Sequence, residues 1–212
     1  MAGEVWWSSL VAADRDVVTL LDGTERARVE SLERPADRGR SMVGAALLRV
    51  AVAAHLGVGP DEVVVDRTCT DCGQPHGVPR IIGPGGPGPW VSVSHSGVLV
   101  VVALSPHGPV GVDVQRESDL PDPRGAQDWV RREAELKAQN AARLGRYPAT
   151  LPAAVEAGAA TRELLPPLDG YAAALTTLGE PVTQHVVRHW PRARGSVVRH
   201  SPRARGSASP ST

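Results

Sequence analysis

One apolar segment near the middle of the chain constrains the fold most, because its residues favour β-structure and little else. Residues 90–104, WVSVSHSGVLVVVAL, predict two strands joined by the turn HSG, which would put Ser94 and His95 at the bend of a hairpin. A serine beside a histidine could suggest a hydrolase. No G-x-S-x-G motif is present, however, and adjacent residues on a strand face opposite ways, which argues against a nucleophile pair.

A third strand, PVGVDVQ, is predicted directly afterwards at residues 109–115. Its alternation sends the valines to one face, and Asp113 and Gln115 to the other. Burying a carboxylate in so apolar a strand is costly unless the group is paired or bound to a metal. Asp113 therefore indicates a site, the alternative being an edge-strand aspartate that faces solvent.

Residues 129–137, WVRREAELK, predict a helix with a chemically mixed face. Trp129, Glu133 and Lys137 recur every four residues, and Asp128 can cap the first turn. Lys137 is the one lysine of the chain, so basic charge elsewhere comes from arginine. The alternative is an ordinary surface helix with a Glu/Lys pair worth about 0.3–0.5 kcal/mol.

Other patterns predict the remaining elements. Residues 37–56 are typical of a long amphipathic helix, with Arg38, Arg40 and Arg49 as its charges. We also expect an extended segment at 4–11, helical structure at 14–32, a strand at 61–67, a flexible connector at 83–89, loose structure at 141–167, a strand or helix at 171–178, and a disordered Arg/Ser/Pro tail at 188–212. Met42, Ala46 or Leu47, Val50 and Ala54 form the expected buried side of the long helix.

The loop CTDCGQPHGVPR carries two cysteines and a histidine at spacings that suggest zinc. A structural zinc site needs four ligands, and only Cys69, Cys72 and His76 are at hand. A loop with reduced thiols is the alternative.

Composition narrows the class of protein. The chain has 212 residues, of which 42% are hydrophobic and 22% charged, so it can bury a core as one domain or two small ones. Its 23 acidic and 23 basic residues argue against a general nucleic-acid binder. No apolar run reaches the roughly 20 residues that span a bilayer, and MAGEVWW is unlike a signal peptide. We expect a cytoplasmic protein with no membrane contact and reduced cysteines.

Five motifs together resemble the 4′-phosphopantetheinyl transferases of the monomeric, surfactin-synthetase-activating type. They are ADRGRSMVGAALLR, HGVPR, VSVSHSG, GVDVQ and WVRREAELK, in family order, with a weaker match in DGYAAALTTLG, for which the family favours a strand. The resemblance implies an α+β fold of two similar pseudo-symmetric halves, each a small antiparallel sheet on a long helix. It also implies Mg²⁺-dependent transfer of the phosphopantetheine arm of coenzyme A to a serine of an acyl or peptidyl carrier protein. Adenosine 3′,5′-bisphosphate would be released, and we expect a monomer.

The same resemblance assigns roles to individual residues. It makes Asp113 and Glu133 the metal carboxylates, with Glu133 also deprotonating the acceptor serine, and it puts Lys137 on a coenzyme A phosphate. It further implies that Ser94, His95, Arg40 and Arg49 bind the nucleotide phosphates. This division suits Mg²⁺, which uses one or two carboxylates with phosphate oxygens, and it suits arginine forks, which bind phosphate.

The chain departs from the family in four places. Gln115 stands where a second metal acid is usual, Val78 replaces a lysine, and Arg132 replaces another. Only 20 positions separate Asp113 from Glu133, so the second half is shortened. We expect an N-terminal half at 1–108, a shortened half at 109–187 and then the tail. A degenerate relative that binds coenzyme A or a carrier protein without transfer is the alternative function.

Overall fold

The computed structural model describes residues 3–83, 86–144, 158–179 and 185–191. Its helices are α1 (Arg15–Thr19), α2 (Gly23–Glu30), α3 (Pro35–Leu56) and α4 (Ala126–Leu144). Its strands are β1 (Gly3–Ser9), β2 (Val64–Asp66), β3 (Arg80–Gly83), β4 (Gly86–Pro87), β5 (Trp90–Ser96), β6 (Leu99–Ser105), β7 (Val110–Arg116), β8 (Ala159–Glu163), β9 (Tyr171–Leu178) and β10 (His185–His189). Within these ranges no helix is long and apolar enough to cross a membrane.

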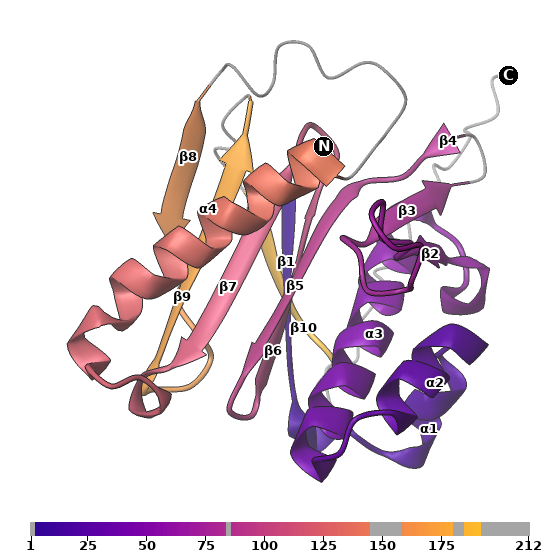
Figure 1. Ribbon diagram of the computed structural model, residues 1–212, viewed down its shortest axis with the longest axis horizontal. Helices are drawn as coiled ribbons and strands as arrows, with labels where there is room; N and C mark the ends of the chain where they lie inside the picture. Colours follow the sequence, from indigo (N-terminus) through magenta and orange to yellow (C-terminus); the bar gives the residue numbers. More distant parts are fainter. Residues whose placement is uncertain (1–2, 84–85, 145–157, 180–184, 192–212) are drawn as a thin grey trace, which may run out of the picture.

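Each of the two long helices covers the outer face of one sheet, and the inner faces of the two sheets pack on each other (Figure 1). The first sheet has the order β10-β1-β6-β5 and carries α3, while the second has the order β7-β9-β8 and carries α4. All pairs in the two sheets are antiparallel except β10 with β1. Strands β2, β3 and β4 form a small third sheet. The expected α+β class is confirmed.

A row of serines connects the two larger sheets. Ser92, Ser94 and Ser96 alternate with larger residues along β5, and all three are buried. Their hydroxyl oxygens accept hydrogen bonds from the backbone N–H groups of Val112, Val114 and Arg116 on β7, at 3.0, 3.4 and 2.9 Å. Alternation puts these hydroxyls on one face of β5, so side chains fix how β7 lies beside β5.

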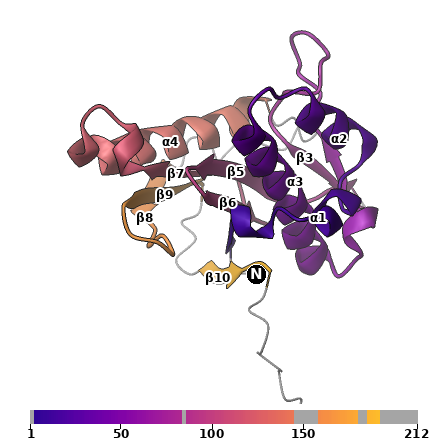
Figure 2. The same ribbon diagram turned by 90° about the horizontal axis from the view of Figure 1, so that it is seen from below.

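Helix α4 lies almost directly on β7, because small residues line the contact. Its buried residues are Ala126, Val130, Ala134, Ala138 and Ala141, which recur at helical spacing. A Cβ atom at Gly111 of β7 would come within 1.9 Å of the Ala134 carbonyl oxygen. Figure 2 shows from below that α4 runs along β7.

The hairpin turns later than the sequence suggested. Ser96 pairs with Leu99, so the turn is formed by Gly97, with a φ of +54°, and Val98. Ser94 and His95 therefore lie inside β5 and not at the bend. The serine bonds to β7 explain why β5 is longer than predicted, because the last of them, at Ser96, holds the end of the strand extended.

Several other boundaries also differ. Residues 14–32 form two helices, because Asp22 caps α2 by accepting the Glu25 N–H at 2.8 Å. The loose structure expected at 141–167 is wrong for the end of α4 and for β8. The connector at 83–89 contains β4, and the strand expected at 61–67 is only β2. The strand prediction for 171–178 is confirmed by β9.

The buried side of α3 and the expected tail also need correction. Ala46 and Leu47 are fully buried, as expected. Met42 and Val50 are only partly buried and Ala54 is exposed, because the helix turns Val43 and Leu47 to the sheet. Strand β10 pairs with β1, so the tail expected from residue 188 begins inside a strand. Residues 192–212 lie outside the described ranges. The division of the chain between residues 108 and 109 stays a prediction.

Candidate functional site

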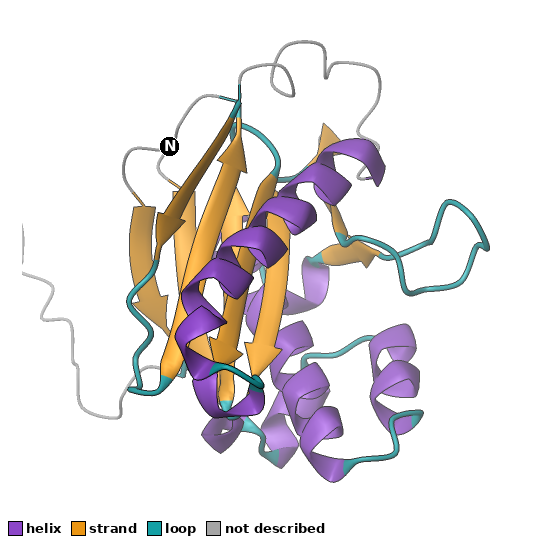
Figure 3. Ribbon diagram, turned by 60° about the vertical axis from the view of Figure 1, so that its left-hand side comes forward, coloured by secondary structure: helices purple, strands orange, loops and turns teal. Residues whose placement is uncertain are grey.

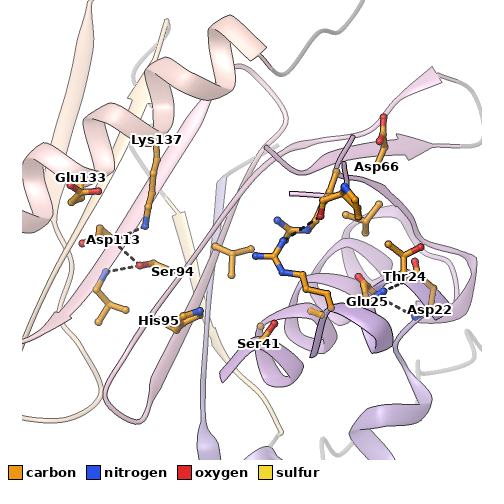
Figure 4. A pocket seen from close by; sticks show the side chains of 18 of the residues that line it. Asp22, Thr24, Glu25, Ser41, Asp66, Ser94, His95, Asp113, Glu133 and Lys137 are labelled. Carbon is orange, nitrogen blue, oxygen red and sulfur yellow. Dashed lines mark hydrogen bonds and ion pairs between the residues drawn. The ribbon is translucent and has the colours of Figure 1, made fainter. Parts of the chain in front are cut away.

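A cavity of about 620 Å³ lies between the α2/α3 region and the wall formed by β5, β7 and α4 (Figure 4). Its size is within the usual range for small-molecule sites. Six site residues expected from the sequence line it, namely Ser94, His95, Asp113, Gln115, Glu133 and Lys137, together with Trp129. The structure thus brings together side chains from three separate motifs.

Asp113 and Lys137 form the polar centre of the β7 and α4 wall. Lys137 Nζ lies 2.6 Å from Asp113 Oδ1, and it also donates to the Val112 carbonyl at 3.2 Å. The Asp113 side chain is only 8% exposed, so this ion pair is well shielded from water. The buried strand aspartate is therefore paired, which is the condition for burying a carboxylate at modest cost.

Ser94 completes a hydrogen-bonded chain with this pair. Its hydroxyl donates to Asp113 Oδ1 at 2.7 Å and accepts the Val114 N–H at 3.4 Å. The serine thus orients the aspartate from β5 while the lysine approaches from α4. Asp113 is fixed from both sides before any ligand binds.

Glu133 lies one helical turn before Lys137 and lines the same cavity (Figure 4). Among the described residues it makes no ion pair and no side-chain hydrogen bond, so its carboxylate is available to a ligand. Gln115, on the same face of β7 as Asp113, donates its amide N–H to the Arg116 carbonyl at 3.0 Å. The shared face predicted for Asp113 and Gln115 is found.

These donors suit a hard divalent cation. Mg²⁺ in proteins commonly takes one or two carboxylates, with waters and substrate phosphate oxygens completing its shell. Asp113 and Glu133 would supply the carboxylates, and Gln115 has a neutral carbonyl oxygen to add. Lys137 donates a hydrogen bond to Oδ1 of Asp113, so Oδ2 is the oxygen that could bind a metal.

Two arginines that the sequence reasoning missed stand on the opposite side of the cavity. Arg28 of α2 and Arg67, just after β2, both line it, and neither pairs with a carboxylate in the described part of the chain. Burial and the nearby positive charge of Arg28 lower the pKa of Arg67 to about 10, although Glu25 acts in the opposite direction. Two unpaired, mutually repelling guanidinium groups at a cavity are typical of an anion site. Neither arginine stands in a motif that would have revealed it.

His95 faces the cavity from β5, beside the cations. Burial, with the positive charges of Arg40 and Lys137, lowers the pKa of its imidazole despite the opposing effect of Asp37. The ring is thus neutral at neutral pH, and a bound anion would favour its protonation.

Arg40 and Arg49, expected near phosphate, are already engaged. Arg40 donates to the Gly97 carbonyl at 2.9 Å and pairs with Asp37. Arg49 is 3% exposed, and its guanidinium binds Glu25 at 2.7 Å, Asp22 at 2.5 Å and the Val63 carbonyl at 2.8 Å. Neither lines the cavity. Arg49 instead links α3 to α2 through these bonds, and so it helps to position α2, which carries Arg28.

Comparison with known proteins adds two relatives. A Synechocystis protein provisionally named 4′-phosphopantetheinyl transferase is 30% identical over 116 residues, which is 53% of this chain and 44% of the relative. A Thraustochytrium protein named phosphopantetheinyl transferase is 33% identical over 108 residues, which is 50% of this chain and 34% of the relative. No family model matches. The matched part covers less than half of each relative, and these distant homologues support the phosphopantetheinyl transferase superfamily for this chain.

Proposed function

We propose that this chain transfers the 4′-phosphopantetheine arm of coenzyme A to a serine of an acyl or peptidyl carrier protein, as a transferase of the surfactin-synthetase-activating type. One observation carries the proposal: Asp113 and Glu133 line one side of the cavity, and Arg28 and Arg67, which pair with no carboxylate among the described residues, line the other. The acids on the arginine side, Asp22, Glu25 and Asp66, are paired with Arg49 or Arg80. A substrate with several phosphates could place its reacting phosphate at the carboxylates and a bound metal, and its other phosphates at the two arginines.

The reaction assigns a role to each side. The carrier serine oxygen bonds to the phosphorus that bears the pantetheine arm, and the pyrophosphate P–O bond breaks, so adenosine 3′,5′-bisphosphate leaves with the electron pair. Glu133 would take the serine proton, a role open to a carboxylate without a partner. Mg²⁺, when bound, would draw negative charge from the phosphate oxygens.

The cationic residues would hold the substrate. Arg28 and Arg67 would bind phosphates of the adenosine end, where their charges become compensated. Lys137 would keep Asp113 in place and present its ammonium group to the reacting phosphates. Ser94 is occupied by Asp113 and β7, so we assign it an orienting role and leave direct phosphate contact to His95.

The test is an intact-mass measurement. Purified chain, coenzyme A, Mg²⁺ and an apo carrier protein should yield a carrier heavier by one phosphopantetheine arm. A carrier whose acceptor serine is replaced by alanine is the control and should keep its mass. The proposal fails if several acyl and peptidyl carrier proteins all keep their apo mass with this chain, while a known phosphopantetheinyl transferase modifies the same carriers.

A second function, binding without transfer, is favoured by two features of the metal wall. Gln115 offers no charge, and the Lys137 ammonium group already neutralises Asp113. Calorimetry separates the two functions: a degenerate relative would bind coenzyme A and produce no mass gain on any carrier.

A further inference from the structure

The loop between β2 and β3 gathers three metal-binding side chains outside the cavity. One ligand atom each from Cys69, Cys72 and His76 lies within 4.8 Å of the others, and Cys72 Sγ is 2.9 Å from His76 Nε2. Both cysteines are free thiols. The loop projects from the body of the protein in Figure 3, so these side chains are accessible.

The loop backbone is already arranged around the first cysteine. The Cys69 N–H donates to the Gln74 carbonyl at 2.8 Å, and the Gly73 N–H donates to the Cys69 carbonyl at 3.0 Å. Gly73 has a φ of +72°, which glycine adopts easily. Backbone bonds of this kind fix the loop around the first cysteine, as outer-shell contacts do in metal sites.

We propose that Cys69, Cys72 and His76 form a zinc site with two thiolates, one imidazole and a fourth ligand from water. The spacing Cys-x2-Cys-x3-His is close to the ligand spacings of zinc sites, and the structure gathers the three ligand atoms in one loop, with one position of the metal left open to water. Ligand atoms of tetrahedral zinc lie about 3.6–3.8 Å apart. Cys72 and His76 must therefore separate by less than about 1 Å, which exposed side chains can do by small rotations.

The same loop forms an edge of the cavity, which gives the zinc site a consequence. Thr68 and Pro75 line the cavity, and Arg28 donates to the Pro75 carbonyl at 3.5 Å. Residues 70–76 are exposed, so little apolar burial holds the loop in shape. Zinc would supply the missing constraint and hold the wall near Arg28 and Arg67. This role is independent of whether the chain transfers a phosphopantetheine arm.

Metal content and a cobalt spectrum test the site on the full chain. Protein purified with a thiol reductant and without chelator should contain one Zn²⁺ per chain, and Co²⁺ substitution should give a thiolate-to-cobalt charge-transfer band with tetrahedral visible bands. Cys69→Ser, Cys72→Ser and His76→Ala should each reduce bound zinc to near zero. His189→Ala, in exposed β10, is the matched control and should keep it.

Exchanging one metal-binding side chain for another separates loss of zinc binding from loss of folding. Cys72→His retains a zinc ligand at the same place, so it should still bind Co²⁺, with a weaker charge-transfer band because one thiolate is gone. Zinc that survives Cys69→Ser and Cys72→Ser, a cobalt spectrum without the thiolate band, or reduced wild-type protein without zinc after Zn²⁺ addition would each overturn the proposal.

Discussion

Arg49 and Arg67 should respond in opposite ways to the same truncation, because one guanidinium group is paired and the other is not. Arg49→Met keeps the apolar stem and removes the group that binds Glu25 and Asp22. Glu25 would then keep a carboxylate only 9% exposed, with one oxygen that already lacks a partner. Breaking a buried pair costs about 3–5 kcal/mol. Asp22 is 42% exposed and adds little.

Arg49→Met should therefore lose a large part of the free energy of unfolding of a chain of this size. At roughly 2–4 °C per kcal/mol, the Tm of Arg49→Met should fall by about 6–20 °C. Arg67→Met should leave the Tm unchanged or raise it, because burial and Arg28 disfavour the Arg67 charge. This penalty is present at neutral pH, since the group stays protonated well below its pKa of about 10, and it is relieved only as the pH rises past that value.

The two variants should rank in the reverse order for nucleotide affinity, with Arg67→Met the more affected. A hydrogen bond to a charged group is worth about 1.5–3 kcal/mol, so Arg67→Met should weaken binding of adenosine 3′,5′-bisphosphate roughly 10–150-fold. Thermal melts and calorimetry measure both effects, with Arg124→Met, a 92% exposed arginine, as the control. The reasoning is refuted if Arg49→Met melts with the wild type, or if Arg67→Met keeps full nucleotide affinity.

Four further predictions test the site and its frame. Glu133→Gln should reduce transfer at least 100-fold without lowering the Tm, because an amide cannot accept the proton, and undiminished turnover would remove Glu133 from the reaction. Gln115→Glu should lower the Mg²⁺ concentration for half-maximal transfer and Asp113→Asn should raise it; unchanged titrations for both would mean that β7 does not hold the metal. Burial and the positive charge of Arg40 lower the pKa of His95, and the negative charge of a bound bisphosphate should raise it again. Affinity for the bisphosphate should therefore increase as the pH falls below neutrality, and calorimetry in two buffers should detect proton uptake that His95→Ala abolishes. Deleting residues 189–212 should lower the free energy of unfolding by about 1–2 kcal/mol more than deleting 192–212 does. The reason is that Trp190 packs on two core clusters and its backbone N–H donates to the Trp7 carbonyl at 2.9 Å. Equal melting temperatures of the two deletion variants would contradict this packing.

Local periodicity explains what could be predicted. The two-residue alternation of β7 placed Asp113 and Gln115 on one face, and helical spacing placed Glu133 and Lys137 on one side of α4. Both patterns depend on neighbours within a few residues, so the sequence carries them directly. That the two faces meet depends on Gly111, whose missing side chain lets α4 lie on β7.

Tertiary partners explain what could not be predicted. The alternating serines of β5 resemble a solvent-facing strand edge, and their bonds to β7 depend on residues 20 positions further along. Strand β10 is polar enough to look disordered, yet it pairs with β1 at the other end of the chain. Such contacts leave no local period in the sequence.

The arginines show why site residues are harder to predict than the fold. Arg49 lies on a helix in a family motif, and only the approach of α2 shows that its charge is neutralised by two carboxylates. Arg67 follows an unremarkable strand, and it matters because no carboxylate in the described residues pairs with it. A cation becomes available to a ligand through the absence of a partner, which depends on the whole fold. For this chain, whose 23 acidic and 23 basic residues balance overall, the informative quantity is which of the arginines remain unpaired around the cavity.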